Sequence, residues 1–216
     1  MKEQTPVLEV RDLSKSYRGV RALYPVSFAL APGECLGVAG PNGSGKSTLL
    51  RLIAQAERPD SGSVFWRGKN VWGDRSFLRT SLGYVPQDAE LAPELTVREQ
   101  FALWRAACGC AGPVRQELTD LLGLAPMLRS RISELSGGMQ RRVSIAMALS
   151  TGRDILVMDE STAGLDESYR TALLAWMERF LAQGGCAVWC THLTDELEKI
   201  CTRCLTVRDG RAAWGR

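Results

Sequence analysis

Short apolar runs alternate with helical patterns along most of the chain. Runs of β-branched and apolar residues bounded by Gly, Pro or Asp predict strands. These strands are expected at residues 7–17, 26–30, 34–39, 64–67, 82–86, 155–158, 187–190 and 205–207. Apolar residues at helical spacing predict helices at residues 47–56 and 169–181. Strands that alternate with helices are typical of an α/β fold with a mainly parallel sheet.

The strand pattern stops between residues 88 and 150, where helical periodicity takes over. Thr96 is placed to cap a helix that carries Val97, Phe101 and Trp104, and residues 114–122 predict another helix. The turn signals at residues 18–19, 31–33 and 59–62 punctuate the flanking strands. We therefore expect a helical lobe inserted into an α/β core.

Composition excludes several classes of protein. The chain has 216 residues, with 27 Lys and Arg against 24 Asp and Glu, and its net charge of +3 is too small to indicate nucleic acid or an anionic membrane as a partner. The first ten residues, MKEQTPVLEV, contain acids and no apolar core, which argues against a signal peptide. The sequence contains no apolar run of the roughly 18 residues that a membrane span needs. We expect a cytosolic protein.

The seven cysteines are spread along the chain and do not form a disulfide framework. The Cys201-x-x-Cys204 spacing is compatible with zinc, with Cys186 and Cys190 as further ligands. The last two lie four apart in an apolar run, too far along a strand to hold one ion easily. We favour core packing for these cysteines, because a buried free thiol behaves as a small hydrophobe.

A glycine-rich segment at residues 40–47, Gly-Pro-Asn-Gly-Ser-Gly-Lys-Ser, lies between a predicted strand and a predicted helix. Its spacing matches a phosphate-binding loop, whose glycines let backbone N–H groups point at phosphate oxygens in front of a helix N-terminus. Lys46 is expected to reach the β- and γ-phosphates, and Ser47 to ligate Mg²⁺. The alternative is a glycine-rich turn that contains a lysine by chance, and the flanking elements argue against it.

Two acids, Asp159 and Glu160, follow the continuous apolar run at residues 155–158. The end of a buried parallel strand places both carboxylates at the edge of the sheet where the phosphate loop lies. Asp159 is expected to hold hydrated Mg²⁺, and Glu160 to polarise the attacking water. Taken alone, the pair is also compatible with an ordinary solvated strand end; the preceding phosphate loop favours the functional reading.

The six residues Leu-Ser-Gly-Gly-Met-Gln at 135–140 stand between the phosphate loop and the acidic strand. Ser136 can cap a helix whose first residues, Gly137 and Gly138, leave backbone amides open to an anion. In this order the three motifs resemble the ATP-binding subunit of ABC transporters, and the resemblance extends over nearly the whole chain. The alternative reading is a simple Ser-Gly-Gly helix start.

The resemblance implies the fold and the ligands. It implies a P-loop NTPase of the ABC ATPase type, with a mixed sheet, an antiparallel β subdomain and an inserted α-helical lobe. The chain would be one domain, with its nucleotide-binding core at residues 1–87 and 151–216 and its helical part at 88–150. ATP and Mg²⁺ are the implied ligands.

The resemblance also assigns roles to individual residues. Gln87 resembles the glutamine that contacts Mg²⁺, and His192, the only histidine, resembles the switch histidine at the γ-phosphate. Catalysis would depend on Glu160, His192 and Gln87, and the metal on Ser47, Gln87 and Asp159. The nucleotide would be bound by Tyr17, Asn42, Gly43, Ser44, Gly45, Lys46, Ser47, Thr48, Ser136, Gly137, Gly138, Gln140 and Asp166. Taken alone, an aromatic residue at a strand end such as Tyr17 more often serves packing, and a lone histidine is ordinarily structural. The position of His192 at the carboxyl end of a predicted strand favours the functional role. Ser161 departs from the family, where many members have proline.

The family's site pairs the phosphate loop of one subunit with the Ser-Gly-Gly segment of another. One copy of each per chain implies a head-to-tail dimer around two ATP molecules, with an identical or a similar partner. ATP-driven motion would pass to integral membrane transporter subunits through the surface around Gln87 and the helical lobe, on the cytoplasmic face of the membrane. Phe101 and Trp104 could contribute to that dock, although core packing is favoured for most aromatic residues there.

Two alternatives stay open at this stage. One is a non-transport ATPase of the same class, such as a cluster-assembly ATPase, and the other is a nucleotide-binding regulator with little turnover. We expect no regulatory domain after Arg216, which weakly favours a compact transporter ATPase of the export type. The sequence does not identify the cargo, the direction of transport, the membrane subunit or the nature of the dimer partner.

Overall fold

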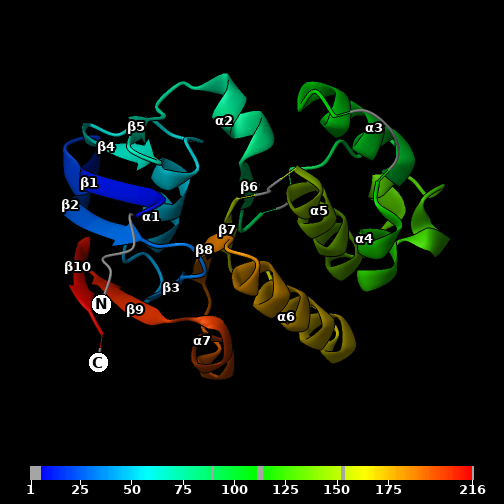
Figure 1. Cartoon of the computed structure of the whole chain (residues 1–216). Coiled ribbons are helices and arrows are strands. Elements are labelled where there is room, and N and C mark those ends of the chain that lie inside the picture. The colour runs from blue at the N-terminus through cyan, green and yellow to red at the C-terminus, as the bar shows by residue number, and fades with distance from the viewer. Residues whose placement is uncertain (1–5, 89, 111–113, 152–153, 216) are drawn as a thin grey trace.

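The computed structural model describes residues 6–88, 90–110, 114–151 and 154–215, and it is built on a six-stranded sheet (Figure 1). The strand order is β10-β9-β3-β8-β7-β6, with every neighbouring pair parallel except β10 and β9. The strands are β3 (Cys35–Ala39), β6 (Leu82–Val85), β7 (Ile155–Asp159), β8 (Cys186–Cys190), β9 (Arg203–Arg208) and β10 (Arg211–Trp214).

Strand β7, which lies between β8 and β6, explains why this sheet has a core on each face. All five of its residues are buried, and alternate side chains point to opposite faces. Ile155 and Val157 join a cluster with helix α1 (Lys46–Ile53), whereas Leu156 and Met158 join a cluster with the later helices. A continuous apolar run is therefore required, because a parallel strand covered on both faces has no side exposed to water.

A second, antiparallel sheet covers helix α1 (Figure 1). Its order is β2-β1-β4-β5, formed by β1 (Leu8–Tyr17), β2 (Val20–Leu30), β4 (Ser61–Trp66) and β5 (Lys69–Asn70). Apolar residues alternate along β1, and Leu8, Val10 and Leu13 pack onto the same cluster as α1. The chain therefore combines a parallel-rich sheet with an antiparallel sheet, as its fold class predicts.

Helices fill the segment in which the strand pattern stops (Figure 1). It contains α3 (Val97–Ala107), α4 (Gln116–Leu121), two 3₁₀ turns (Ala125–Met127 and Ile132–Glu134) and all but the last residue of α5 (Gly137–Thr151). Thr96 caps α3 as expected: its hydroxyl accepts the N–H of Glu99, whose carboxylate accepts the N–H of Thr96. In the described part of this segment the β pairing is a single bridge, Thr96 to Arg131. The exact division at residues 88 and 150 stays a prediction.

Three further helices complete the fold. Helix α6 (Glu167–Ala182) connects β7 to β8 and α7 (Thr194–Ile200) connects β8 to β9, so each lies in a crossover between parallel strands. Helix α2 (Arg75–Thr80) begins at Asp74, whose carboxylate accepts the N–H groups of Ser76 and Phe77. None of the helices in the residues that the structure describes is both long and apolar enough to cross a membrane.

Several sequence predictions need correction. Strand β2 begins at Val20 rather than Val26, because Pro25 lies on an edge strand where its missing N–H costs no pairing. Ser61 and Gly62, predicted as a turn, belong to β4. The helices α2 and α7 and the strands β5 and β10 carried too few periodic residues to be predicted.

Gly62 sits opposite a bulge in β1 that fixes how the two strands pair. The register shifts between Arg11 and Ser14, Asp12 has φ of 48°, and Gly62 has φ of 88°. A Cβ built on Gly62 would overlap the carbonyl group of Asp12, which is backbone and cannot rotate away. This position therefore requires glycine for both its conformation and its space.

We predict that Gly62→Ala lowers the free energy of unfolding by about 3 kcal/mol, the sum of a left-handed alanine and a backbone overlap. Urea unfolding of the full chain measures it. Gly68→Ala is the matched control, since Gly68 has φ of 77° but no atom within 4 Å of a built Cβ, and it should cost only about 1 kcal/mol. Equal losses of unfolding free energy in the two variants would contradict a steric overlap between residue 62 and the Asp12 carbonyl.

Candidate functional site

The loop at residues 40–47 wraps closely in front of α1. Gly40, Gly43 and Gly45 all have positive φ, at 145°, 74° and 108°. Side chains are excluded at two of these positions, because a Cβ on Gly40 would overlap the carbonyl of Val207 and one on Gly45 would lie 2.5 Å from the carbonyl oxygen of Ala22. The loop therefore has the backbone path that lets successive N–H groups converge on an anion.

Lys46 is the first residue of α1 and is almost fully buried, although it is charged. Its ammonium group donates to the carbonyl oxygens of Gly40 (2.8 Å) and Pro41 (3.0 Å) in the same loop. These bonds hold the cation inside the loop, where an entering phosphate would meet it. The buried hydroxyl of Ser44 has no hydrogen-bond partner in the described structure, so a donor is free for a ligand oxygen.

The parallel sheet brings the other predicted groups to the same edge. Strands β3, β8, β7 and β6 are neighbours in that order, and their carboxyl ends lie together. The residues that follow these ends are the phosphate loop after β3, His192 after β8, Glu160 after β7 and Gln87 after β6. Groups separated by more than a hundred residues in the chain thus meet at one edge of the sheet.

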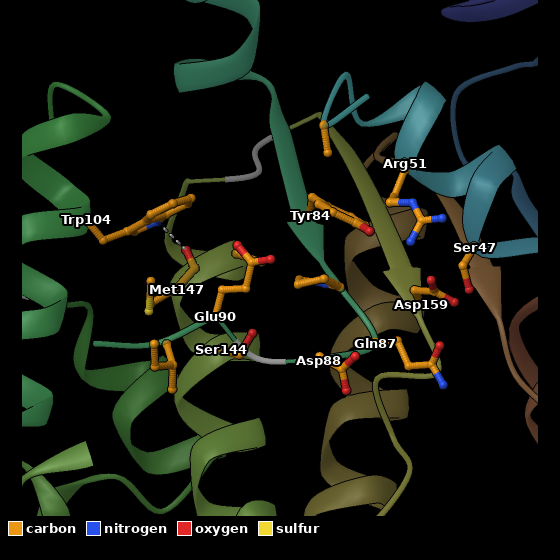
Figure 2. A pocket seen from close by; sticks show the side chains of 14 residues that line it. Ser47, Arg51, Tyr84, Gln87, Asp88, Glu90, Trp104, Ser144, Met147 and Asp159 are labelled. Atoms are coloured by element: carbon orange, nitrogen blue, oxygen red, sulfur yellow. Dashed lines mark hydrogen bonds between the residues drawn. The ribbon is translucent and has the colours of Figure 1, made fainter. Parts of the chain in front are cut away.

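A cavity of about 430 Å³ contains the three predicted metal ligands, Ser47, Gln87 and Asp159 (Figure 2). Figure 2 shows Ser47 and Asp159 close together on one side, with Gln87 below them. Tyr84 and Arg51 line the cavity beside them, and Trp104 of α3 lines its far wall. All three predicted ligands can offer an oxygen atom, the donor that Mg²⁺ prefers.

Asp159 is the most desolvated group at this edge, with a side chain that is almost completely buried. Burial raises the pKa of its carboxyl group, and hydrogen bonds with Ser47 and Cys190 oppose that rise. One carboxylate oxygen, Oδ1, accepts no hydrogen bond from the described part of the chain. A buried oxygen without a partner, next to a hydroxyl and an amide oxygen, fits a divalent cation.

Glu160 and His192 contact each other directly. His192 Nε2 lies 2.7 Å from Glu160 Oε1. Glu160 has φ of 47°, an uncommon conformation for a residue with a side chain, and its N–H donates to the carbonyl of Cys190. The pair lines a hollow of about 450 Å³ together with Thr162 and Gly164 of the following loop. A carboxylate fixed by an imidazole at a strand end can orient and polarise a water molecule.

Arg141 of α5 is a site residue that the sequence predictions missed. Its guanidinium donates to the carbonyl oxygen of Pro86 (2.6 Å) and also to that of Gln87. The backbone that carries Gln87 is therefore tied to the helix that begins at Gly137. The only sequence signal is that Arg141 directly follows Gln140, which does not say where its side chain goes.

The Ser-Gly-Gly segment forms the start of α5, as predicted. The N–H of Met139 donates to the hydroxyl of Ser136 at 3.3 Å, so Ser136 caps the helix. Gly138 has no room for a side chain, because a built Cβ would lie 2.7 Å from the carbonyl oxygen of Gly164. Ser136 and Gly138 line a hollow of about 140 Å³ with Gly164 and Asp166, away from the cavity that holds Ser47 and Asp159.

The remaining predicted residues are spread around these hollows. Tyr17 ends β1 with its ring 38% exposed, and its hydroxyl donates to Glu57 at 2.5 Å. The side-chain amide of Gln140 donates to the carbonyls of Ile132 and Leu135, so it holds the segment in place. Asn42, Gly43, Gly137 and Asp166 are exposed, and Thr48 is buried in α1.

The cysteines do not converge on a metal site in the residues that the structure describes. Cys186 and Cys190 are fully buried in β8, and burial raises the thiol pKa of Cys186 to about 12. Such thiols stay protonated, whereas zinc binds thiolates. Both side chains pack in the core cluster with α1.

Known proteins resemble the chain over most of its length. A family model described as ABC transporter matches residues 23–163. Nod factor export ATP-binding protein I of Rhizobium etli is 36% identical over 209 residues, which cover 95% of this chain and 66% of that protein. The protein of the same name from Paraburkholderia xenovorans is 36% identical over 211 residues, which cover 94% of this chain and 68% of that protein. The chain thus spans about two thirds of the length of these curated relatives.

Solved structures share the fold. An ATP-binding subunit of an ABC transporter superposes with a TM-score of 0.88 at 29% identity, over 97% of this chain and 89% of that one. A dimeric ATP-binding cassette in a post-hydrolysis state, bound to ADP and Pi, gives a TM-score of 0.85 at 26% identity, over 97% of this chain and 99% of that one. These likenesses confirm the predicted P-loop fold of the ABC ATPase type.

The burial of Asp159 predicts that Asp159→Asn stabilises the folded chain by about 1 kcal/mol, as often found when a strained site is relieved. The gain is complete above the raised pKa of the native carboxyl. It is lost as pH falls toward the unfolded value of about 3.9, because the native Asp159 then binds a proton and its desolvation cost disappears. Urea unfolding at several pH values measures this.

Asp154→Asn at the other end of the same strand is the matched control. Asp154 is partly exposed and lies 3.5 Å from Arg67, so its loss should destabilise the chain by about 0–1 kcal/mol. A destabilised Asp159→Asn variant at neutral pH would contradict a net cost of burying this carboxylate with one oxygen unpartnered.

Proposed function

The chain belongs to the ABC transporter family as an ATP-binding subunit, and we propose that it hydrolyses ATP to drive substrate movement through separate membrane subunits. One observation carries this proposal: four adjacent parallel strands deliver the phosphate loop, His192, Glu160 and Gln87 to a single edge of the sheet. Anion-binding backbone, a fixed carboxylate and oxygen ligands are the groups that hydrolysis of a nucleoside triphosphate requires.

Within one chain, the phosphate loop binds the triphosphate. The N–H groups of residues 42–48 and the Lys46 ammonium stabilise its negative charge. Tyr17, the last residue of β1, stacks on the base of the nucleotide. The hydroxyl of Ser44 offers a further donor. Lys46 exchanges its contacts with the loop carbonyls for phosphate oxygens, so the site does not have to bring in a cation from solvent.

Ser47, Asp159 and Gln87 would hold Mg²⁺ in the cavity that they share. The cation would neutralise phosphate charge and orient the terminal phosphate. Glu160 accepts a hydrogen bond from the attacking water and so increases its nucleophilicity. His192 Nε2, which lies 2.7 Å from Glu160 Oε1, keeps that carboxylate directed at the site. Water and ATP give ADP and phosphate, and the proton that the water loses passes toward Glu160.

A second copy or a similar subunit completes each site. Ser136, Gly137 and Gly138 form an anion-binding helix start, yet Ser136 and Gly138 line a hollow different from the cavity that holds Ser47 and Asp159. In a head-to-tail dimer they would contact the γ-phosphate held by the other chain, with Asp166 and the surrounding loop between the two. Gln140 would act by keeping this segment rigid. The dimeric form of the similar cassette bound to ADP and Pi supports this arrangement.

Membrane subunits would dock on the surface around Gln87 and the helical lobe, which includes α3. Leu103 of α3 is 57% exposed, while Phe101 is core and Trp104 is tied to the carbonyl of Met147. Hydrogen bonds from the Arg141 guanidinium to the carbonyl oxygens of Pro86 and Gln87 would carry motion from that surface to the site. The names of the relatives from Rhizobium etli and Paraburkholderia xenovorans refer to export, which supports export as the direction. The alternative is a cluster-assembly ATPase with soluble partners only.

We predict that Glu160→Gln abolishes turnover and traps an ATP-bound dimer, because the variant binds nucleotide but cannot activate water. Its rate should fall at least about a hundredfold. Analytical ultracentrifugation with and without Mg-ATP measures the dimer. Glu178→Gln, an exposed acid on α6, serves as control and should keep its turnover. A Glu160→Gln chain that stays monomeric with ATP would argue against the ATP-bound dimer.

We predict that Leu103→Glu prevents copurification of a polytopic membrane protein from detergent extracts while leaving the ATP turnover of the isolated chain unchanged. Burying a carboxylate in an apolar interface without a partner should weaken binding about tenfold or more. Trp72→Glu adds the same charge on the antiparallel-sheet side, where Trp72 is 39% exposed, and should retain the partner. Recovery of soluble partners alone with the native chain would favour the cluster-assembly alternative.

A further inference from the structure

Glu196 is a carboxylate with no exposed surface, and none of the roles above uses it. It lies in α7, four residues after His192. Ile200 follows Glu196 by four positions, so the two buried residues of α7 share one face of the helix. An apolar residue at 196 would continue that face without the cost of burying a charge.

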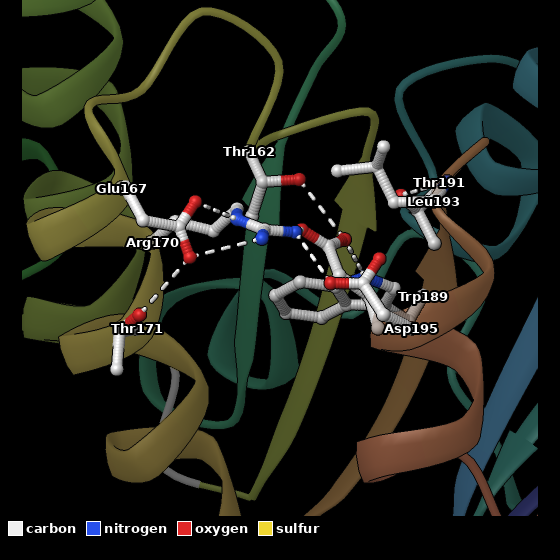
Figure 3. A network of polar contacts seen from close by, with 9 residues as sticks. Thr162, Glu167, Arg170, Thr171, Trp189, Thr191, Leu193 and Asp195 are labelled. Carbon is white, nitrogen blue, oxygen red and sulfur yellow. Dashed lines mark hydrogen bonds and ion pairs between the residues drawn. The ribbon is translucent and has the colours of Figure 1, made fainter.

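Three elements direct polar groups at this one carboxylate (Figure 3). The hydroxyl of Thr162 donates to Oε2 at 3.0 Å, and the indole N–H of Trp189 donates to the same oxygen at 3.2 Å. Arg170 of α6 places its guanidinium 3.6 Å from Oε1. Figure 3 shows Thr162, Trp189 and Arg170 converging from the loop, the strand and the helix.

Each of these groups is close in sequence to a residue of the candidate site. Thr162 is two residues after Glu160, in the loop that lines both the Glu160–His192 hollow and the Ser136–Gly138 hollow through Gly164. Trp189 is three residues before His192, in the strand that ends there. A movement of Glu196 would therefore displace the loops that carry both members of the Glu160–His192 pair.

Arg170 contacts three carboxylates, and Glu196 differs from the other two in its burial. Its guanidinium contacts Glu167 through two hydrogen bonds of 3.0 Å and Asp195 through one of 2.8 Å, in addition to the longer contact with Glu196. Glu167 and Asp195 are largely exposed, whereas Glu196 is not. Water can replace the contacts with Glu167 and Asp195 but not the buried one, so Glu196 is the member of this group that joins α6 and α7 in the protein interior.

We propose that Glu196 is a positioning residue, which holds the Thr162 loop and the His192 loop in one fixed relation and thereby aligns Glu160 for hydrolysis. The inference rests on the proposed ATPase function. Glu196 has no contact with the phosphate loop, so nucleotide binding to a single chain does not depend on it, whereas turnover and closure of the dimer do.

The test compares Glu196→Gln and Thr162→Val with the native full chain. Both substitutions nearly keep side-chain volume. Thr162→Val removes the hydroxyl that donates to Glu196, and Glu196→Gln removes the negative charge toward which Thr162, Trp189 and Arg170 are directed. We expect kcat to fall about tenfold or more while the KM for ATP changes less than about twofold, since misalignment affects the reacting groups and not the phosphate loop. In the Glu160→Gln background, Glu196→Gln should raise the protein concentration needed for the ATP-dependent dimer.

Asp195→Asn is the matched control. It removes an acid of the same helix that contacts the same arginine, Arg170. Asp195 is exposed, however, and does not contact Thr162 or Trp189. Its kcat should stay within about twofold of the native value. Because the two contact partners act as a unit, the Thr162→Val/Glu196→Gln double variant should lose little more than either single one.

The outcomes separate this inference from the proposed function. The proposed function itself would be overturned if the native chain did not hydrolyse ATP and the Glu160→Gln variant did not dimerise with ATP. Native turnover with unchanged kcat in Glu196→Gln and Thr162→Val would overturn only the positioning role. A fall in kcat that matches the lost folded fraction, measured by urea unfolding and by binding of a fluorescent ATP analogue, would also overturn it, because such a residue would serve folding alone.

Discussion

Burial of the parallel sheet on both faces is the constraint on which the rest of the molecule depends. Strand β7 has no exposed residue, so a charged side chain can first appear where the strand ends. Asp159 and Glu160 stand at that point, and β3, β8 and β6 end at the same edge. The sheet thereby concentrates polar groups from four segments in one place. The positions of these polar groups are well defined, because each group follows a strand that close packing holds rigid.

Features that depend on local pattern could be predicted from the sequence. The apolar run before Asp159, the glycine spacing of the phosphate loop and the capping residue Thr96 each reflect a requirement of their own segment. Features that depend on distant partners could not. Arg141 reaches Gln87 across 54 positions, and Glu196 meets Thr162 across 34. No periodicity encodes such contacts, although an acid on the apolar face of a short helix was a signal available for Glu196.

The loop from Ser161 to Asp166 connects two functions that lie in different hollows. Gly164 and Leu165 border both the hollow of Glu160 and His192 and the hollow of Ser136 and Gly138. A shift in this loop therefore alters the position of Glu160 and the surface at Ser136 and Gly138 together. Because interfaces and packed cores adopt discrete arrangements, a small displacement can act as a switch between them. The Thr162–Glu196 contact lies at the base of this loop.

The unpartnered oxygen of Asp159 has a consequence for the lifetime of the protein in a cell. A chain with an unpartnered carboxylate oxygen in a buried site is less stable when the site is empty than when a ligand fills it. A ligand present at about a hundred times its dissociation constant adds about 2.7 kcal/mol of stability, which lowers the unfolded population about a hundredfold. Proteases and chaperones act on that unfolded population. The supply of nucleotide would thus affect the lifetime of the protein molecule as well as its activity.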